Sequence, residues 1–411
     1  MTAELVLLII LSIFTLDFIL ERILDVLNNR TLKTELPELG KDIYNKDEYS
    51  QMLSYEKETG RFSLILSVIG FIVTFLLLFY GFFGWFDSII RQFGFTNQIV
   101  VGLLFFGVLG FVSDILTTPF SIYSTFVIEE KFGFNKSSYS TFFTDKIKGW
   151  LLGGLLGGVM YSVMVLLFNY FGTYFWIFAW LVIAGFSIIM NMFYTSLIMP
   201  LFNKLKPLEE GELRQKIQLY CNSVNFPLTN VFVIDGSKRS SKANAFFSGL
   251  GKQKKIVLYD TLIEKLSQEE IVAVLAHEVG HYKKKHIVLS TILTMLLMGL
   301  ILFLLSLTLN NETLAEAIGA STTSFHISLI LFGFLYTPIS LITGVLMNIL
   351  SRKNEFEADD FAKNTYQSVH LQSSLKKLAV DSLSNLTPHK GYVFFHYSHP
   401  PLLQRIENLK N

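Results

Sequence analysis

Long apolar runs separated by polar segments dominate the pattern of the chain. Because about twenty apolar residues in a helix suffice to cross a bilayer, each such run predicts a membrane span. Seven runs reach this length, and they cover residues 4–24, 62–86, 98–122, 149–171, 174–199, 286–309 and 325–349. The pattern therefore predicts a mainly α-helical integral membrane protein with seven transmembrane helices.

Two polar segments, residues 200–285 and 350–411, are long enough to fold outside the membrane. Within the first, residues 230–235 and 256–260 have the apolar, β-branched character of strands. The piece 243–247 leads into the second of these through a glycine-rich turn. We expect a small β-sheet in this segment.

The composition agrees with an integral membrane protein and argues against a soluble protein or a nucleic-acid-binding protein. Of 411 residues, 51% are hydrophobic and only 16% are charged, which is too apolar for an ordinary soluble protein. The net charge of +1 and the lack of a basic arm give no reason to expect nucleic-acid binding. The single cysteine, Cys221, cannot form an intramolecular disulfide.

The lysines and arginines predict the orientation in the membrane, because cytoplasmic loops are enriched in them. With seven spans, Arg91 falls on one side and the other 33 of the 34 basic residues fall on the opposite side. We therefore expect the N-terminus outside, the C-terminus in the cytoplasm, and both polar segments on the cytoplasmic side.

An HExxH motif begins at His277, just before the sixth span. Ser267 and Glu270 form a predicted capping box, which places the motif on a helix. There, His277 and His281 share one face and can bind one zinc ion, with Glu278 beside the open coordination position. Zinc would activate a water and Glu278 would take its proton. The alternative, a pair of ordinary core histidines, would bury ionisable groups without compensation.

A catalytic zinc commonly has three protein ligands, so a further donor is expected. After the last span, Glu355 and Asp359 are four residues apart and share one helical face. We assign Glu355 to the zinc and Asp359 to a hydrogen bond that fixes a ligand imidazole. The alternative is a solvated acidic helix start. His286 is rejected as a ligand, because on a continuing helix it lies 180° from His277, and a role at the membrane interface is expected for it.

Further motifs accompany these two segments in a fixed order, at residues 126–136, 200–205, 240–245, 256–262 and 398–405. Together they resemble the type I CAAX prenyl protease family of membrane-integral zinc metallopeptidases, with HExxH and a distant ExxxD. The resemblance runs from about residue 110 to the end. It implies one Zn²⁺ ion per chain, held by His277, His281 and Glu355. Glu278 would be the general base, and Asp359 would orient a ligand histidine.

Four other residues take their roles from the resemblance. Asn244 and Ala245 match an edge strand that holds an extended substrate backbone by strand addition. His399 matches a histidine that contacts the substrate and donates to the tetrahedral intermediate, and Arg405 lies near the same site. From the sequence alone, His399 would be a surface residue before two prolines and Asn244 a turn or cap residue.

The resemblance also implies a fold in which seven tilted transmembrane helices surround an intramembrane chamber, beside a cytoplasmic metallopeptidase domain with a small sheet. Polar residues inside the spans, among them Asp17 and Asp114, would line the chamber, with helix packing as the alternative. We expect four parts. They are 1–199 with five transmembrane helices, 200–285 with the edge strand and HExxH helix, 286–349 with spans six and seven, and 350–411 with the third ligand.

The implied function is cleavage of a peptide bond near the C-terminus of membrane-associated CAAX-type substrates, prenylated ones included. The expected partners are this substrate and membrane lipid, and no obligate protein partner is implied. The short connection between spans six and seven and the lack of a C-terminal retention signal favour a bacterial inner membrane slightly over the endoplasmic reticulum. A quality-control protease of the HtpX type is the alternative. A seven-span transporter or receptor is a distant third, because a general-base glutamate has no evident use in transport.

Overall fold

The computed structural model describes residues 2–248 and 254–410, and most of the glycine-rich turn expected near residue 250 lies outside them. Six described stretches are long and apolar enough to cross a membrane, and one of them, Tyr139–Phe202, is 64 residues long. A straight helix of that length would measure about 96 Å, far more than a bilayer. That stretch contains two long helices separated by a 3₁₀ turn at Gly172–Tyr174, and it ends in a π-helical turn and the short helix Met199–Phe202.

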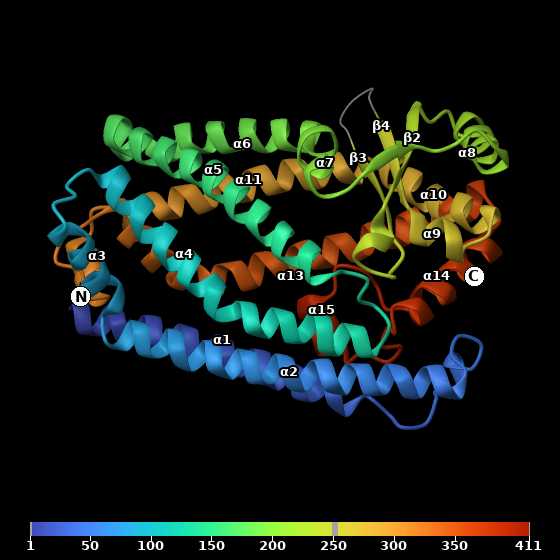
Figure 1. Cartoon of the computed structure of the whole chain (residues 1–411), viewed down its shortest axis with the longest axis horizontal. Helices are drawn as coiled ribbons and strands as arrows, with labels where there is room; N and C mark the ends of the chain where they lie inside the picture. Colours follow the sequence, from blue (N-terminus) through green and yellow to red (C-terminus); the bar gives the residue numbers. More distant parts are fainter. Residues whose placement is uncertain (1, 249–253, 411) are drawn as a thin grey trace.

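The described part of the chain therefore contains the seven predicted membrane helices. They are α1 (Ala3–Arg30), α2 (Lys46–Phe79), α4 (Gln98–Tyr123), α5 (Tyr139–Phe171), α6 (Phe175–Phe193), α11 (His286–Thr308) and α13 (Phe325–Thr365). Figure 1 shows α1 and α2 along one side of the molecule, α6 and α11 along the other, and α4 and α13 running obliquely between them. The N-terminus lies at one end of the long axis, and the C-terminus lies at the other end, beside the sheet and the shorter helices.

Shorter helices connect and follow these membrane helices. They are α3 (Phe82–Gln92), α7 (Met199–Phe202), α8 (Glu212–Ser223), α9 (Asp260–Lys265), α10 (Gln268–Lys283), α12 (Glu312–Ala317), α14 (Ser368–Asp381), α15 (Lys390–His396) and α16 (Leu402–Lys410). Single turns of 3₁₀ or π-helix lie at Glu38–Gly40, Ser124–Glu129, Tyr194–Ile198 and Gly236–Lys238.

The predicted span 62–86 is too long at its C-terminal end, because α2 stops at Phe79 and α3 starts as a separate helix. Gly81 has a φ of +64°, a left-handed conformation that ends α2 and turns the chain. A Cβ on Gly84 would lie 1.9 Å from the backbone of Gly319, so only glycine permits this close approach. A continuous apolar run conceals such a turn, which explains the error.

Two polar residues of the predicted spans link helices. His326 is fully buried, and its Nε2 lies 2.7 Å from Asp87, which also pairs with Arg91. Asp114 on α4 accepts a hydrogen bond from Lys146 of α5 at 2.8 Å. These contacts match helix packing, and the lining of a chamber by such residues stays a prediction.

The described strands form a mixed four-stranded sheet in the order β1-β2-β4-β3. Its strands are β1 (Leu205–Pro207), β2 (Leu228–Ile234), β3 (Ala245–Ser248) and β4 (Lys254–Tyr259). β2 and β4 are parallel, and the outer strands are antiparallel to their neighbours. The predicted small sheet is confirmed, and β3 is an edge strand as the resemblance implied. β1 was not predicted, because three residues ending in proline show no alternating pattern.

The predicted HExxH helix is α10, and its N-terminus has the predicted capping box. Ser267 accepts from the Glu270 backbone at 3.3 Å, and the Glu270 carboxylate accepts from the Ser267 backbone at 2.8 Å. Apolar residues such as Ile271, Leu275 and Val279 bury one face in the core shared with the sheet and α8. α10 is therefore fixed at its start and along its length.

Cys221 on α8 offers a direct test of this core. Its side chain is 1% exposed, and burial raises the pKa of its thiol from 9.0 to about 12. We expect no reaction with maleimide in the folded protein near neutral pH, and full labelling in denaturant, measured by mass spectrometry. The stabilisation from keeping this thiol neutral is complete below pH 9.0 and lost as the pH rises toward 12. Rapid labelling without denaturant would contradict the placement of α8.

Candidate active site

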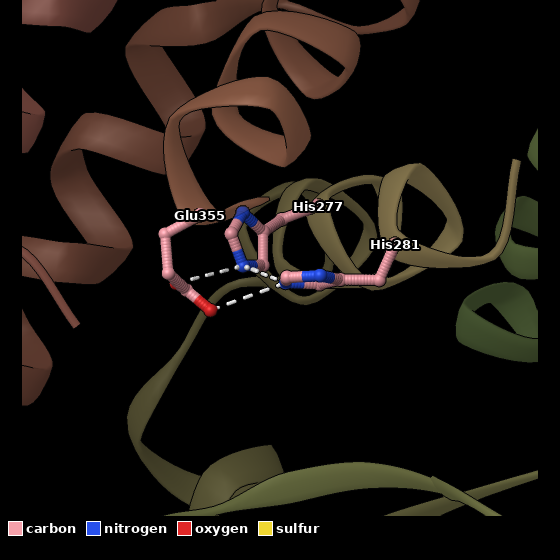
Figure 2. A group of neighbouring side chains, drawn as sticks. All are labelled: His277, His281 and Glu355. Carbon is pink, nitrogen blue, oxygen red and sulfur yellow. Dashed lines mark hydrogen bonds and ion pairs between the residues drawn. The ribbon is translucent and has the colours of Figure 1, made fainter. Parts of the chain in front are cut away.

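The three predicted metal ligands converge between α10 and α13. His277 and His281 extend from one face of α10 toward Glu355 on α13 (Figure 2). The two Nε2 atoms are 3.2 Å apart, and the Glu355 carboxylate oxygens lie 3.4 Å from His277 and 3.2 Å from His281. One small volume is thus bounded by two imidazole nitrogens and a carboxylate.

This donor set fits a metal ion. Zinc binds imidazole nitrogen and carboxylate oxygen at about 2.0–2.2 Å, so two ligand atoms on a tetrahedron lie about 3.4 Å apart. The three observed separations match that value. Within residues 2–248 and 254–410, Oε2 of Glu355 is also buried without a hydrogen-bond partner. A cation would satisfy this atom and the two facing nitrogens together.

His277 is oriented from behind by a buried ion pair. Its Nδ1 lies 2.8 Å from Asp359, which is fully buried and receives two hydrogen bonds from Arg405, at 2.8 and 2.6 Å. Burial alone would lower the pKa of His277, but the hydrogen bonds to Asp359 and Glu355 raise it to about 8. The carboxylates therefore favour a positive charge between the imidazoles, which a metal cation would supply.

Arg405 supports the same group of residues. Burial alone would lower its pKa, but Asp359 and the neighbouring glutamates raise it, so the guanidinium is held charged. Its Nη1 also lies 3.4 Å from Oε2 of Glu355. The guanidinium therefore joins the third ligand to the carboxylate behind His277.

Two other predicted residues lie at this site. His399, whose side chain is 64% exposed, places Nε2 3.4 Å from Oε1 of Glu355. Glu278 follows His277 on α10 and is half-buried. In the described part of the chain, the Glu278 carboxylate has no hydrogen bond or ion pair, so it is available to a water molecule. The structure thus brings His399, Asp359 and Arg405 to the three predicted ligands, and Glu278 lies next to His277 on α10.

Asn244 and Ala245 lie on the sheet rather than in the ligand cluster. Ala245 begins β3, and Asn244 immediately precedes it and accepts a backbone hydrogen bond from Tyr259. The Asn244 side chain turns back to the Ala245 backbone N–H at 2.8 Å. Ala245 is thus on the edge strand and Asn244 is directly before it, where an extended peptide could add to the sheet.

The rejection of His286 rested on an incorrect assumption about the helix. α10 ends at Lys283, and Lys285 adopts a left-handed φ of +60°, so α11 starts in a new direction at His286. His286 is not one of the three converging donors, but its Nδ1 lies 3.1 Å from Nδ1 of His281. Its Nε2 lies 3.1 Å from Glu357, which sequence reasoning also missed. The three consecutive lysines at the end of α10 were the available signal for a helix end.

Gly280 lets α10 approach α13 closely. A Cβ there would lie 3.0 Å from the backbone of Ala358. We expect Gly280→Ala to lower the free energy of unfolding by roughly 1–3 kcal/mol and to weaken zinc binding, because it pushes Glu355 away from the histidines. Gly344→Ala on α13 is the matched control, since a Cβ there meets nothing within 4 Å. Equal thermal stability and zinc affinity in both variants would contradict this close helix contact.

A cluster of two histidines and one glutamate that could hold a metal ion, beside a bundle of membrane helices, is typical of a membrane-integral metallopeptidase. Comparison with known proteins agrees. Residues 26–204 match the family described as CAAX prenyl protease N-terminal, five membrane helices, and residues 207–411 match Peptidase family M48.

Full-length relatives give the same result. The chain is 37% identical to the CAAX prenyl protease 1 homolog of Oryza sativa, over 98% of this chain and 96% of the relative, and 33% identical to CAAX prenyl protease 1 of Saccharomyces cerevisiae, over 92% and 89%. The crystal structure of S. mikatae Ste24p superposes with a TM-score of 0.94 at 32% identity, covering 99% of both chains. The chain belongs to the CAAX prenyl protease 1 family of M48 metallopeptidases.

Family membership confirms several predictions. The protein is a multi-pass integral membrane metalloendopeptidase that acts on peptide or protein substrates. The resemblance and the fold class stated from the sequence are both confirmed. The rice and yeast relatives are eukaryotic, so these comparisons do not support the preference for a bacterial inner membrane.

Proposed function

We propose that the protein is a zinc endopeptidase that cleaves near the C-terminus of membrane-associated CAAX-type substrates. The observation that carries this proposal is the convergence of His277, His281 and Glu355, with Glu278 beside them, in a chain similar over its full length to CAAX prenyl proteases. Bound zinc would supply Lewis acidity to a water and a substrate carbonyl.

Residues of the protein would supply the other catalytic and substrate-binding groups. Glu278 takes the proton of the attacking water, and His399 donates a hydrogen bond to the oxygen that becomes negatively charged. Asn244 and Ala245 hold the extended substrate backbone at the free edge of β3. Asp359 and Arg405 keep His277 in the tautomer that leaves Nε2 free for the metal.

A cavity beside the ligands supports a lipid-modified substrate. It has a volume of about 480 Å³, is bounded by α6, α11 and α13, and has His281 on its wall. Apolar side chains such as Ile183, Met295 and Met298 line much of it. A prenyl group attached near the scissile bond would find apolar surface there.

The test is incubation of the detergent-purified protein with a farnesylated CAAX peptide, with and without a chelator, followed by mass spectrometry. We expect one C-terminal fragment to be released, and only without the chelator. The unfarnesylated peptide is the control for the lipid. Broad degradation of unfolded membrane proteins, without cleavage of the farnesylated peptide at one bond, would contradict the proposal and favour a quality-control role.

We further propose that the N-terminus lies outside and the C-terminus in the cytoplasm, with the four parts that we expected from the sequence. The two termini lie at opposite ends of the long axis, as seven crossings require (Figure 1). Cysteines introduced singly at Asn311 and Lys206, in a chain carrying Cys221→Ser, test the orientation. An impermeant reagent applied to intact cells should label the first and not the second, and the opposite pattern would overturn the proposal.

A further inference from the structure

The two ligand histidines differ in what lies behind them. His277 has a direct contact to the buried carboxylate of Asp359. Among the residues that the structure describes, His281 has no carboxylate at that distance from its Nδ1. Instead, Nδ1 faces the ring of His286, whose far nitrogen faces Glu357. On its Nδ1 side, the second ligand is therefore linked to a carboxylate through another histidine.

The roles of the ring nitrogens follow from the ligand geometry. Nε2 of His281 faces His277 and Glu355, so it carries the lone pair for the metal and Nδ1 carries the hydrogen. With a metal on Nε2 of His281, its Nδ1–H would donate to Nδ1 of His286, which lies 3.1 Å away, and Nε2–H of His286 would donate to Oε2 of Glu357, also 3.1 Å away. In this series from His281 through His286 to Glu357, each atom would act either as a donor or as an acceptor, so every hydrogen bond would have both partners.

His281 needs such support more than His277 does. Its side chain is 18% exposed against 8% for His277, and it lies on the wall of the cavity between α6 and α11. It is also within three residues of the end of α10. Packing alone therefore holds the imidazole ring of His281 less firmly than that of His277.

We propose that His286 and Glu357 are positioning residues that hold the metal-binding tautomer and the orientation of His281. The left-handed conformation of Lys285 turns the chain so that the first residue of the membrane helix α11 returns to the metal site. Glu357 comes from α13, two residues after the ligand Glu355. One hydrogen-bonded chain thereby connects α10, α11 and α13 at the site.

The proposal rests on the metal site of the proposed function, but its test needs no substrate. Full-length protein in detergent is titrated with zinc against a chromophoric chelator, and the dissociation constant is compared among variants. Losing the support of a ligand histidine typically weakens metal binding by roughly 10–100-fold, which we expect for His286→Leu. His286→Asn places an oxygen where Nδ1 was, so it should recover part of the loss.

Glu357→Gln should also weaken zinc binding in the wild-type background. It should have no added effect in His286→Leu, because that variant has already lost the hydrogen bonds that link Glu357 to His281. Lys353→Ala is the matched control. It removes the exposed cation 3.7 Å from Glu357 without touching the histidines, and it should bind zinc as the wild type does. A merely structural role would instead give Asn and Leu equal losses and make the effects of positions 286 and 357 additive.

Each result of these measurements either supports or contradicts the proposal. Zinc binding by His286→Leu within twofold of the wild type would overturn the proposal, as would additive effects. If His286→Leu does not fold, as judged by thermal unfolding, the comparison of Glu357→Gln with Lys353→Ala decides instead. A wild-type protein that binds no zinc would disprove the metal site as well as the proposal. Tight wild-type binding without cleavage of a CAAX peptide would contradict only the substrate assignment.

Discussion

Replacing Glu278 with glutamine is expected to abolish peptide hydrolysis while leaving the metal in place. Glu278 is next to a ligand in sequence, but it is not one of the three converging groups, so the amide should not disturb zinc binding. Loss of a positioned general base typically lowers the rate by roughly 10²–10⁴-fold. Cleavage of the farnesylated peptide and zinc content by mass spectrometry measure the two effects on the same preparation.

The control for this prediction is Glu269→Gln on the same helix. Its carboxylate pairs with Lys216 at 2.6 Å at the surface, away from the metal ligands. We expect near wild-type cleavage, because an exposed ion pair contributes little to stability. If Glu278→Gln cleaved as fast as Glu269→Gln, Glu278 would not be the base. If Glu278→Gln lost its zinc, the assignment of Glu278 as a base that does not bind the metal would be wrong.

Arg405→Ala is expected to destabilise the protein by roughly 3–5 kcal/mol, because it leaves the fully buried carboxylate of Asp359 without its cation. Zinc binding should weaken as well, since His277 and Glu355 both lie beside this guanidinium. Denaturant unfolding and the zinc titration measure the two effects.

Two variants sharpen this prediction. Adding Asp359→Asn to Arg405→Ala removes the uncompensated charge, so the double variant should be less destabilised than the sum of the two single variants. Arg214→Ala is the surface control, because its partner Glu210 is 82% exposed, and it should cost about 0–1 kcal/mol. Additive losses, or equal losses for Arg214 and Arg405, would show that the buried pair does not stabilise the site.

The membrane helices could be predicted because a span requires about twenty apolar residues, and little else produces such a run. Their ends were less predictable. The turn at Gly81 depends on contact with Gly319, more than two hundred residues away, and nothing near Gly81 in the sequence indicates that contact. The short strand β1 depends on pairing with β2 and likewise has no local pattern.

The functional site, too, could be predicted from the sequence only in part. Residues four apart on one helix are neighbours, so the spacing of His277 and His281 and that of Glu355 and Asp359 could be read directly. His399 and Arg405 come from a separate segment, and only the resemblance connected them to the metal ligands. His286 was misplaced because the angular argument assumed one continuous helix across Lys285.

One consequence follows from α13, which is unbroken from Phe325 to Thr365. Glu355 lies 30 residues beyond its start, about 45 Å along the axis, so each degree of rotation about the outer end would displace the ligand by about 0.8 Å. Pro338 lies between the outer end and Glu355, and a bend there would displace the ligand as well. We expect zinc affinity and peptide cleavage to change together when the protein is moved between nanodiscs of short and long acyl chains. Constant values across these lipids would show that the contact at Gly280 holds the ligands in place independently of the bilayer.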